Sequence, residues 1–159
     1  MPNLEMELIK VKRILSIAGS DSGGGAGMQA DLKTFAALGA YGTSVITAVT
    51  AQNTLGVIDL HPIPATIVAS QIDAVLSDIG TDAIKTGMLA NREIIDVVVE
   101  TLNKYDLPKL IVDPVMISTT GSRLITEDAV ESLRTKLLPI ADVITPNVSE
   151  AEVLLKRNL

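Results

Sequence analysis

The sequence predicts an α/β protein with a mostly parallel central sheet that helices cover on both faces. Short apolar segments alternate with segments of helical periodicity along most of the 159 residues. The connections after the apolar segments are rich in glycine, proline and polar residues, as ligand loops at the carboxyl ends of parallel strands are. This alternation is typical of strand–helix–strand units with right-handed crossovers, and nothing in the chain suggests a repeat or a linker.

The predicted strands are short, rich in Val, Ile and Leu, and bounded by turn residues. They are residues 12–18, 41–51, 56–60, 82–86, 110–112 and 142–145. Residues 41–51, rich in Val, Ile and Thr, are expected to form a single strand.

The predicted helices lie where apolar residues recur at a spacing of three and four. In residues 26–38 the inward-facing positions are expected to be Met28, Leu32, Phe35 and Leu38. Side-chain oxygens of Asn91 and Thr126 are expected to cap the helices that follow them. The other predicted helices are residues 64–76, 91–103, 126–138 and a segment from about 149.

Composition excludes several classes of function. Aromatic residues make up 2% and the net charge is −6, which argues against base stacking and against a nucleic-acid partner. Without cysteine there is neither a disulfide framework nor a thiolate metal site. The first residues do not resemble a signal peptide, and no apolar run could span a bilayer, so a cytoplasmic protein with no membrane partner is expected.

The glycine-rich segment from Gly19 to Gly27 follows the first strand and leads into a helix. It is not a Walker A loop, because no Lys-Ser/Thr pair follows at the required spacing, and Met28 replaces the third glycine of the dinucleotide pattern. Two interpretations are open. The segment is either a tight turn or a loop whose backbone approaches a ligand near a helix N-terminus.

Two polar residues are candidates for substrate contact, each with a structural alternative. Asp31, one turn into the first helix, either complements the helix dipole or orients a substrate hydroxyl. Gln52 either satisfies loop backbone or uses its carbonyl and NH2 groups to pair with the amino group and adjacent nitrogen of an aminopyrimidine.

Three further candidates follow later strands. Met88 is either a core residue or packs against a ring. Asp113 either forms a turn before Pro114 or supplies an oxygen ligand to Mg²⁺. Asn147 and Glu150 either form a capping box or, through a water at Glu150, help to hold the same ion.

Together these segments resemble the hydroxymethylpyrimidine/phosphomethylpyrimidine kinases of thiamine biosynthesis, which belong to the ribokinase-like superfamily. The pyridoxal kinases share that fold but match the first motif less well. The resemblance covers nearly everything after residue 10, so residues 11–159 are expected to be the N-terminal portion of one ribokinase-like domain and residues 1–10 a leader. The motifs that carry it are Ala18-Gly19-Ser20-Asp21-Ser22-Gly23-Gly24-Gly25-Ala26-Gly27-Met28-Gln29-Ala30-Asp31, Thr47-Ala48-Val49-Thr50-Ala51-Gln52-Asn53-Thr54, Lys85-Thr86-Gly87-Met88-Leu89, Val112-Asp113-Pro114-Val115-Met116 and Ile144-Thr145-Pro146-Asn147.

The resemblance implies a three-layer α/β/α fold and ATP-dependent, Mg²⁺-assisted phosphorylation of a hydroxymethylpyrimidine or its monophosphate. It implies that Asp113, Asn147 and Glu150 face the nucleotide and Mg²⁺, and that Asp113 and Glu150 contact the metal. Thr50 replaces the aliphatic residue that relatives often carry. The residues expected around the pyrimidine are Gly19, Ala26, Asp31, Gln52, Met88 and Val115.

The family domain continues past residue 159 with a Gly-Thr-Gly loop, most of the nucleotide site and the catalytic residue. This chain alone is therefore expected to contain no catalytic residue, to transfer phosphate slowly or not at all, and to form homo-oligomers through an uncovered sheet edge. The alternative is a noncatalytic remnant that binds the pyrimidine or only assembles.

Overall fold

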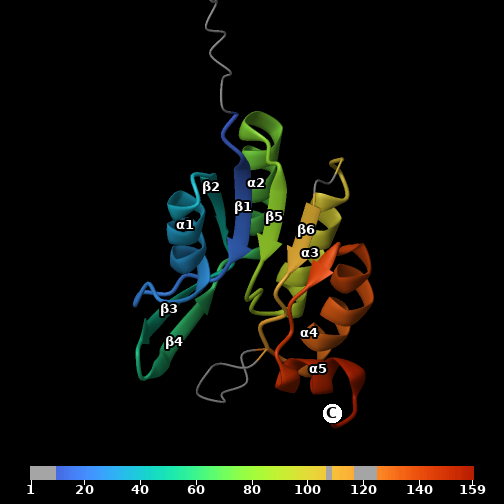
Figure 1. The fold of residues 1–159 in the computed structure, drawn as a ribbon. Coiled ribbons are helices and arrows are strands. Elements are labelled where there is room, and N and C mark those ends of the chain that lie inside the picture. The colour runs from blue at the N-terminus through green and yellow to red at the C-terminus, as the bar shows by residue number, and fades with distance from the viewer. Residues whose placement is uncertain (1–9, 107–108, 117–124) are drawn as a thin grey trace, which may run out of the picture.

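The computed structural model describes residues 10–106, 109–116 and 125–159, so the predicted leader lies outside the described residues except for Lys10. Within them, five parallel strands form the central sheet in the order β2-β1-β5-β6-β7 (Figure 1). The strands are β1 Arg13–Ala18, β2 Tyr41–Ile46, β5 Ala83–Thr86, β6 Lys109–Val112 and β7 Val143–Ile144.

The direction in which the chain crosses the sheet decides where the helices lie. From β1 the chain moves to β2 on one side, and from β2 it moves stepwise to β7 on the other side. Right-handed crossovers therefore put α1 on one face and α2, α3 and α4 on the opposite face. The direction reverses at the boundary between β1 and β5, which is where ligands bind in sheets of this kind. The helices are α1 Gly27–Ala37, α2 Ala65–Ala74, α3 Arg92–Leu102, α4 Glu127–Ser132 and α5 Val148–Leu155.

The helix predictions hold in position and differ in detail. Asn91 caps α3 as predicted, because its Oδ1 accepts from Ile94 N at 2.9 Å. Thr126 occupies the N-cap position of α4 but makes no capping bond, since its hydroxyl bonds the Asp128 carboxylate. Leu38 is exposed because α1 ends at Ala37. Wider π turns follow two helices, at Val75–Ile79 after α2 and at Leu133–Leu137 after α4, and the latter leads into a 3₁₀ turn at Leu138–Ile140.

Residues 41–51 do not form one strand, which corrects the sequence prediction. The chain bends at Thr47 and leaves the sheet, and β3 (Ala48–Asn53) pairs antiparallel with β4 (Gly56–Pro62). Three hydrogen bonds fix the bend: the Thr47 amide donates to Ala18 O, its hydroxyl to Met88 O, and Ile63 N donates to Thr47 O. The resulting hairpin projects beyond the carboxyl ends of the parallel strands (Figure 1).

The core lies between the sheet and the α2–α3–α4 layer. Ile94, Ile95, Val98 and Leu102 of α3 are buried, as are alternate side chains of β5 and β6. At the β7 end the sheet is less covered, and Val143 and Ile144 are 50% and 46% exposed. The predicted fold class is confirmed: a parallel sheet between helical layers, incompletely covered on the C-terminal side.

One buried hydroxyl in the core gives a test of the packing. Among the described residues, Thr86 Oγ1 on β5 is buried without a hydrogen-bond partner, which is unfavourable. Thr86→Val is expected to raise the free energy of unfolding by about 1 kcal/mol, measured by urea denaturation.

Thr47→Val is the matched control, because the equally buried Thr47 hydroxyl donates to Met88 O at 2.7 Å. This control is expected to lose about 1 kcal/mol. Equal losses in both variants would contradict the account of Thr86.

Candidate functional site

A cavity of about 340 Å³ lies at the carboxyl ends of β1 and β5, where the direction of the chain reverses. The glycine loop, α1, the β3–β4 hairpin and the segments after β5 and β6 contribute to its wall. Its size is in the range of small-molecule sites. The lining residues are Gly19, Ser20, Asp21, Ala26, Gly27, Ala30, Asp31, Thr50, Gln52, Val57, Lys85, Gly87, Met88, Asp113 and Val115.

The structure thus brings together residues that the sequence places far apart. Two residues expected to face the nucleotide, Asn147 and Glu150, are not in the cavity wall. All six residues predicted to contact the substrate line the cavity, and so does Asp113. Their contacts with a bound substrate stay predictions.

Asp21 organises the glycine loop. Its carboxylate accepts from the amides of Gly23, Gly25 and Ala26 at 2.7, 2.9 and 2.8 Å. Burial acts to raise the pKa of the Asp21 carboxyl, but these backbone donors and that of Gly24 outweigh it, so the pKa lies below its usual value. Asp21 therefore serves the loop itself, and the loop N–H groups stabilise its negative charge.

Backbone contacts hold the loop against its neighbours. Gly19 N donates to Met88 O at 3.1 Å, and Met28 N donates to Gly19 O at 2.9 Å. Gly27 has φ +53°, and a Cβ there would lie 2.4 Å from Gly19 O. Only glycine fits this close approach, which lets α1 begin directly beside the cavity. Of the two interpretations of the glycine segment, the structure supports a turn that also forms a cavity wall.

The polar floor of the cavity is built from neighbouring strands and α1. Ser16 of β1 and Lys85 of β5 are register partners. Ser16 Oγ donates to Asp31 Oδ2 at 2.6 Å, and Lys85 Nζ lies 3.1 Å from Asp31 Oδ1. Two donors thus hold the Asp31 carboxylate, so it does more than complement the helix dipole.

The hairpin supplies the amide side of the cavity. Thr50 Oγ1 lies 2.6 Å from Ser20 O and 3.2 Å from Gln52 Oε1. Gln52 N donates to Ser22 Oγ at 2.8 Å, and Ser22 Oγ donates to Gln52 O. Gln52 therefore lies within β3 and not in a loop after a strand, and its backbone is tied to Ser22 of the glycine loop while its side-chain carbonyl contacts Thr50.

The described residues fit a magnesium ion only in part. Asp113 follows β6, is partly exposed, and has Oδ2 3.5 Å from Lys85 Nζ. Glu150 is buried, and its carboxylate accepts from Asn147 N and Met116 N, while Asn147 Oδ1 accepts from Glu150 N. These bonds support the capping-box interpretation. In the part of the chain that the structure describes, no group of three or more acidic or histidine side chains could hold a metal. Of the two carboxylates predicted to contact the metal, Asp113 lines the cavity and Glu150 does not; both metal contacts stay predictions.

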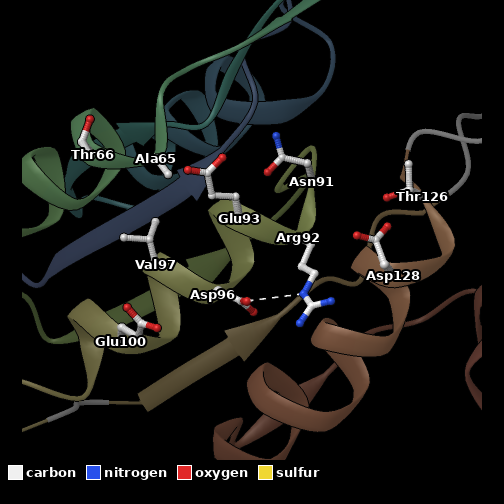
Figure 2. A pocket seen from close by; sticks show the side chains of 10 residues that line it. All are labelled: Ala65, Thr66, Asn91, Arg92, Glu93, Asp96, Val97, Glu100, Thr126 and Asp128. Carbon is white, nitrogen blue, oxygen red and sulfur yellow. Dashed lines mark ion pairs between the residues drawn. The ribbon is translucent and has the colours of Figure 1, made fainter.

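A second hollow, of about 620 Å³, lies along α3 and beside the starts of α2 and α4 (Figure 2). Its wall carries the carboxylates of Glu93, Glu100 and Asp128, and Arg92 pairs with Asp96 at 3.6 Å. It is wide and open, and neither the glycine loop nor the hairpin contributes to it. The smaller cavity, where polar groups converge, is therefore the candidate site.

Comparison with known proteins identifies the family of the chain. The sequence profile of phosphomethylpyrimidine kinase matches residues 21–159. The chain belongs to the phosphomethylpyrimidine kinase family. A hydroxymethylpyrimidine/phosphomethylpyrimidine kinase of Haemophilus influenzae is 57% identical over 144 residues, which are 91% of this chain and 54% of the relative. A chloroplastic thiamine biosynthetic bifunctional enzyme of Arabidopsis thaliana is 53% identical over 146 residues, 92% of this chain and 28% of that enzyme.

Solved structures of kinases share the fold. The phosphomethylpyrimidine kinase of Clostridium difficile superposes with a TM-score of 0.88 at 51% identity, over 94% of this chain and 64% of that one. A pyridoxal kinase of Staphylococcus aureus in complex with pyridoxal superposes with a TM-score of 0.82 at 39% identity, over 94% of this chain and 56% of that one. The ribokinase-like fold is therefore confirmed. The chain spans about half the length of the curated hydroxymethylpyrimidine/phosphomethylpyrimidine kinases it matches. Among its described residues, no helix has the length and apolar character needed to cross a membrane.

Three residues at the site were not assigned roles from the sequence. Lys85 and Ser16 hold Asp31, and Asp21 holds the glycine loop. Asp21 precedes its donors by two to five residues, which is a local pattern that the sequence displays. Lys85 and Ser16 meet Asp31 only through strand register and the placement of α1, which single-sequence periodicity does not reveal.

Proposed function

We propose that this cavity binds 4-amino-5-hydroxymethyl-2-methylpyrimidine or its monophosphate, as the substrate half of an ATP-dependent kinase. The observation that carries the proposal is the pairing of an amide and a carboxylate across one small cavity. Gln52 on the hairpin offers a carbonyl and an NH2 to the aminopyrimidine edge, and Asp31 on α1 offers an acceptor to the hydroxymethyl group. The names of the relatives support the same substrates.

In the proposed reaction an oxygen of the alcohol or of its monophosphate bonds to the γ-phosphorus of ATP while the bond from that phosphorus to the β–γ bridging oxygen breaks, and ADP leaves. Asp31, held by Ser16 and Lys85, orients the hydroxyl by accepting its hydrogen. Met88 and Val115 pack against the ring. Magnesium, when bound, neutralises phosphate charge, and Asp113 is the described side chain placed to contact it. Solved pyridoxal kinases with ADP and AMP-PCP support the use of a nucleotide by this fold.

We expect the 159-residue chain by itself to bind the pyrimidine while transferring phosphate slowly or not at all. Phosphoryl transfer depends on donors arranged around the transferring group. The sequence has one glycine-rich loop, which forms the wall of the pyrimidine cavity. Calorimetric titration and an ADP-release assay on the same sample test this. Binding without turnover supports a binding half, turnover at a kinase-like rate overturns that expectation, and no binding overturns the proposal.

Self-association is part of the same proposal. Val143 and Ile144 lie exposed on the edge strand, and Leu55 and Ile58 are exposed on the hairpin. Apolar surface at an open sheet edge favours pairing with another chain. Sedimentation equilibrium is expected to show a concentration-dependent assembly, and a monomer at all concentrations would contradict it.

Gln52→Ala is expected to weaken pyrimidine binding by more than about tenfold, because a paired amide contact contributes about 1–3 kcal/mol of discrimination. Isothermal titration calorimetry measures the loss. Gln52→Glu keeps the size but removes the NH2 donor, so it is expected to lose affinity as well.

Asn53→Ala is the neighbouring control. Asn53 is exposed, and its side chain accepts from Leu55 N in the hairpin turn rather than facing the cavity. The affinity of Asn53→Ala for the pyrimidine is expected to stay within about threefold of that of the original protein, since the substitution removes no group that lines the cavity. Equal losses in the Gln52 and Asn53 variants would remove Gln52 from the proposed site.

A further inference from the structure

One cationic side chain stands among the described residues that line the cavity, and it is Lys85. Its Nζ lies 3.1 and 3.2 Å from the two Asp31 oxygens and 3.5 Å from Asp113 Oδ2. The side chain is 22% exposed, so the ammonium is reachable from the cavity. Lys33, the other lysine near the glycine loop, donates to Gly24 O and does not line the cavity.

We infer that Lys85 is the specificity residue that lets one cavity hold both a neutral pyrimidine alcohol and its anionic monophosphate. The inference rests on the proposed function. With the alcohol bound, the ammonium stays on Asp31, whose carboxylate accepts from the hydroxyl. With the monophosphate bound, the ammonium turns from the carboxylates to the phosphate and donates to its oxygens.

The charges around the cavity make such a cation necessary. Asp31 and Asp113 both line the cavity, so any phosphate bound there lies near two carboxylates. A phosphate beside two carboxylates is repelled unless a positive charge lies between them. Asp21 adds no cation, and its own carboxylate is held by the loop amides. Lys85 is already placed between the two acids.

The geometry also allows the movement. Strand pairing with Ser16 on β1 and Ile111 on β6 fixes the backbone of Lys85. Beyond it, the side chain has a flexible four-carbon stem and three donors. Next to it, Gly87 leaves space: a Cβ there would lie 3.2 Å from Lys85 Nζ and 3.1 Å from Ala18 Cβ. The backbone of Lys85 is thus fixed by strand pairing, while its ammonium is shared between Asp31 and Asp113.

The test compares the alcohol and the monophosphate by calorimetric titration of the full 159-residue chain without nucleotide. Lys85→Met is expected to weaken monophosphate binding roughly 10- to 100-fold more than it weakens alcohol binding, because only the monophosphate accepts directly from the ammonium, and this is the range typical of hydrogen bonds to charged groups. Lys85→Arg keeps the charge, so the ratio of the two dissociation constants is expected to stay within about threefold of the original. Lys12→Met, which alters a lysine at the opposite end of the sheet, controls for loss of a positive charge.

The outcomes separate this inference from the proposed function. An unchanged ratio in Lys85→Met, with both ligands weakened alike, would mean that Lys85 only supports Asp31 and would overturn the inference. Alcohol binding without monophosphate binding in the original chain would overturn the inference and leave the alcohol as the proposed substrate. Binding of neither compound would overturn both.

Should Lys85→Met not fold, the side-chain ¹³Cε resonance of Lys85 in the original protein decides the question. It is expected to move with the monophosphate and to stay nearly fixed with the alcohol, and equal movement would contradict the inference.

Discussion

Replacing Gly27 with alanine is expected to lower the free energy of unfolding by about 3–4 kcal/mol and to remove pyrimidine binding. At φ +53° an L side chain is strained, and a Cβ would lie 2.4 Å from the carbonyl oxygen of Gly19. That oxygen accepts from Met28 N, so the clash cannot be relieved without moving the start of α1 away from the glycine loop. Urea denaturation followed by circular dichroism measures the loss, because the chain has no tryptophan.

Gly39→Ala separates backbone strain from the clash. Gly39 has φ +74°, and nothing lies within 4 Å of the Cβ it would gain. The strain alone is expected to cost about 1–2 kcal/mol and to leave pyrimidine binding unchanged. If the two variants lost the same stability, the close approach of Gly27 to Gly19 would not be what holds the loop.

Local signals in the sequence predicted an element correctly where its structure depends on contacts between residues close in the sequence. The α3 helix begins at the predicted cap, and its apolar spacing gives its buried face. The strand predicted at residues 41–51 was wrong because the bend at Thr47 depends on Ala18 and Met88, which are distant in the sequence. Apolar and β-branched residues continue across the bend, so periodicity carries no sign of it.

The same distinction applies to the site. Asp31 and Gln52 could be chosen as candidates by residue type, but residue type alone did not exclude the structural alternative for either of them. What favours a binding role is their arrangement: the register of β1 and β5 places Ser16 and Lys85 beneath Asp31, and the hairpin carries Gln52 over the glycine loop. For Glu150 the arrangement favours the structural alternative, since its carboxylate is buried and bonded to backbone amides.

Asp21→Asn is expected to lower the free energy of unfolding at pH 7 by about 2–4 kcal/mol, because charge-assisted bonds to several amides are lost together. The Asn amide can accept with its oxygen, but its NH2 group would face N–H donors that the second carboxylate oxygen now satisfies. The glycine loop would open, and pyrimidine affinity is expected to fall with stability. Urea denaturation and calorimetry on the same preparations measure both quantities.

The pH dependence of this loss distinguishes a charged carboxylate from a merely polar group. Because the pKa of folded Asp21 lies below its usual value of 3.8, its contribution is complete well above pH 3.8 and disappears as the pH falls through the lower folded value. The stability difference between the original protein and Asp21→Asn is therefore expected to be constant from pH 7 to about 5 and to shrink below that. Asp78→Asn, at an exposed position, controls for the change in net charge. Parallel curves for Asp21→Asn and the original protein down to pH 3 would mean that ionisation of Asp21 does not hold the loop. Convergence is the expected result, because a protonated carboxyl, like an amide, can no longer accept with both ends.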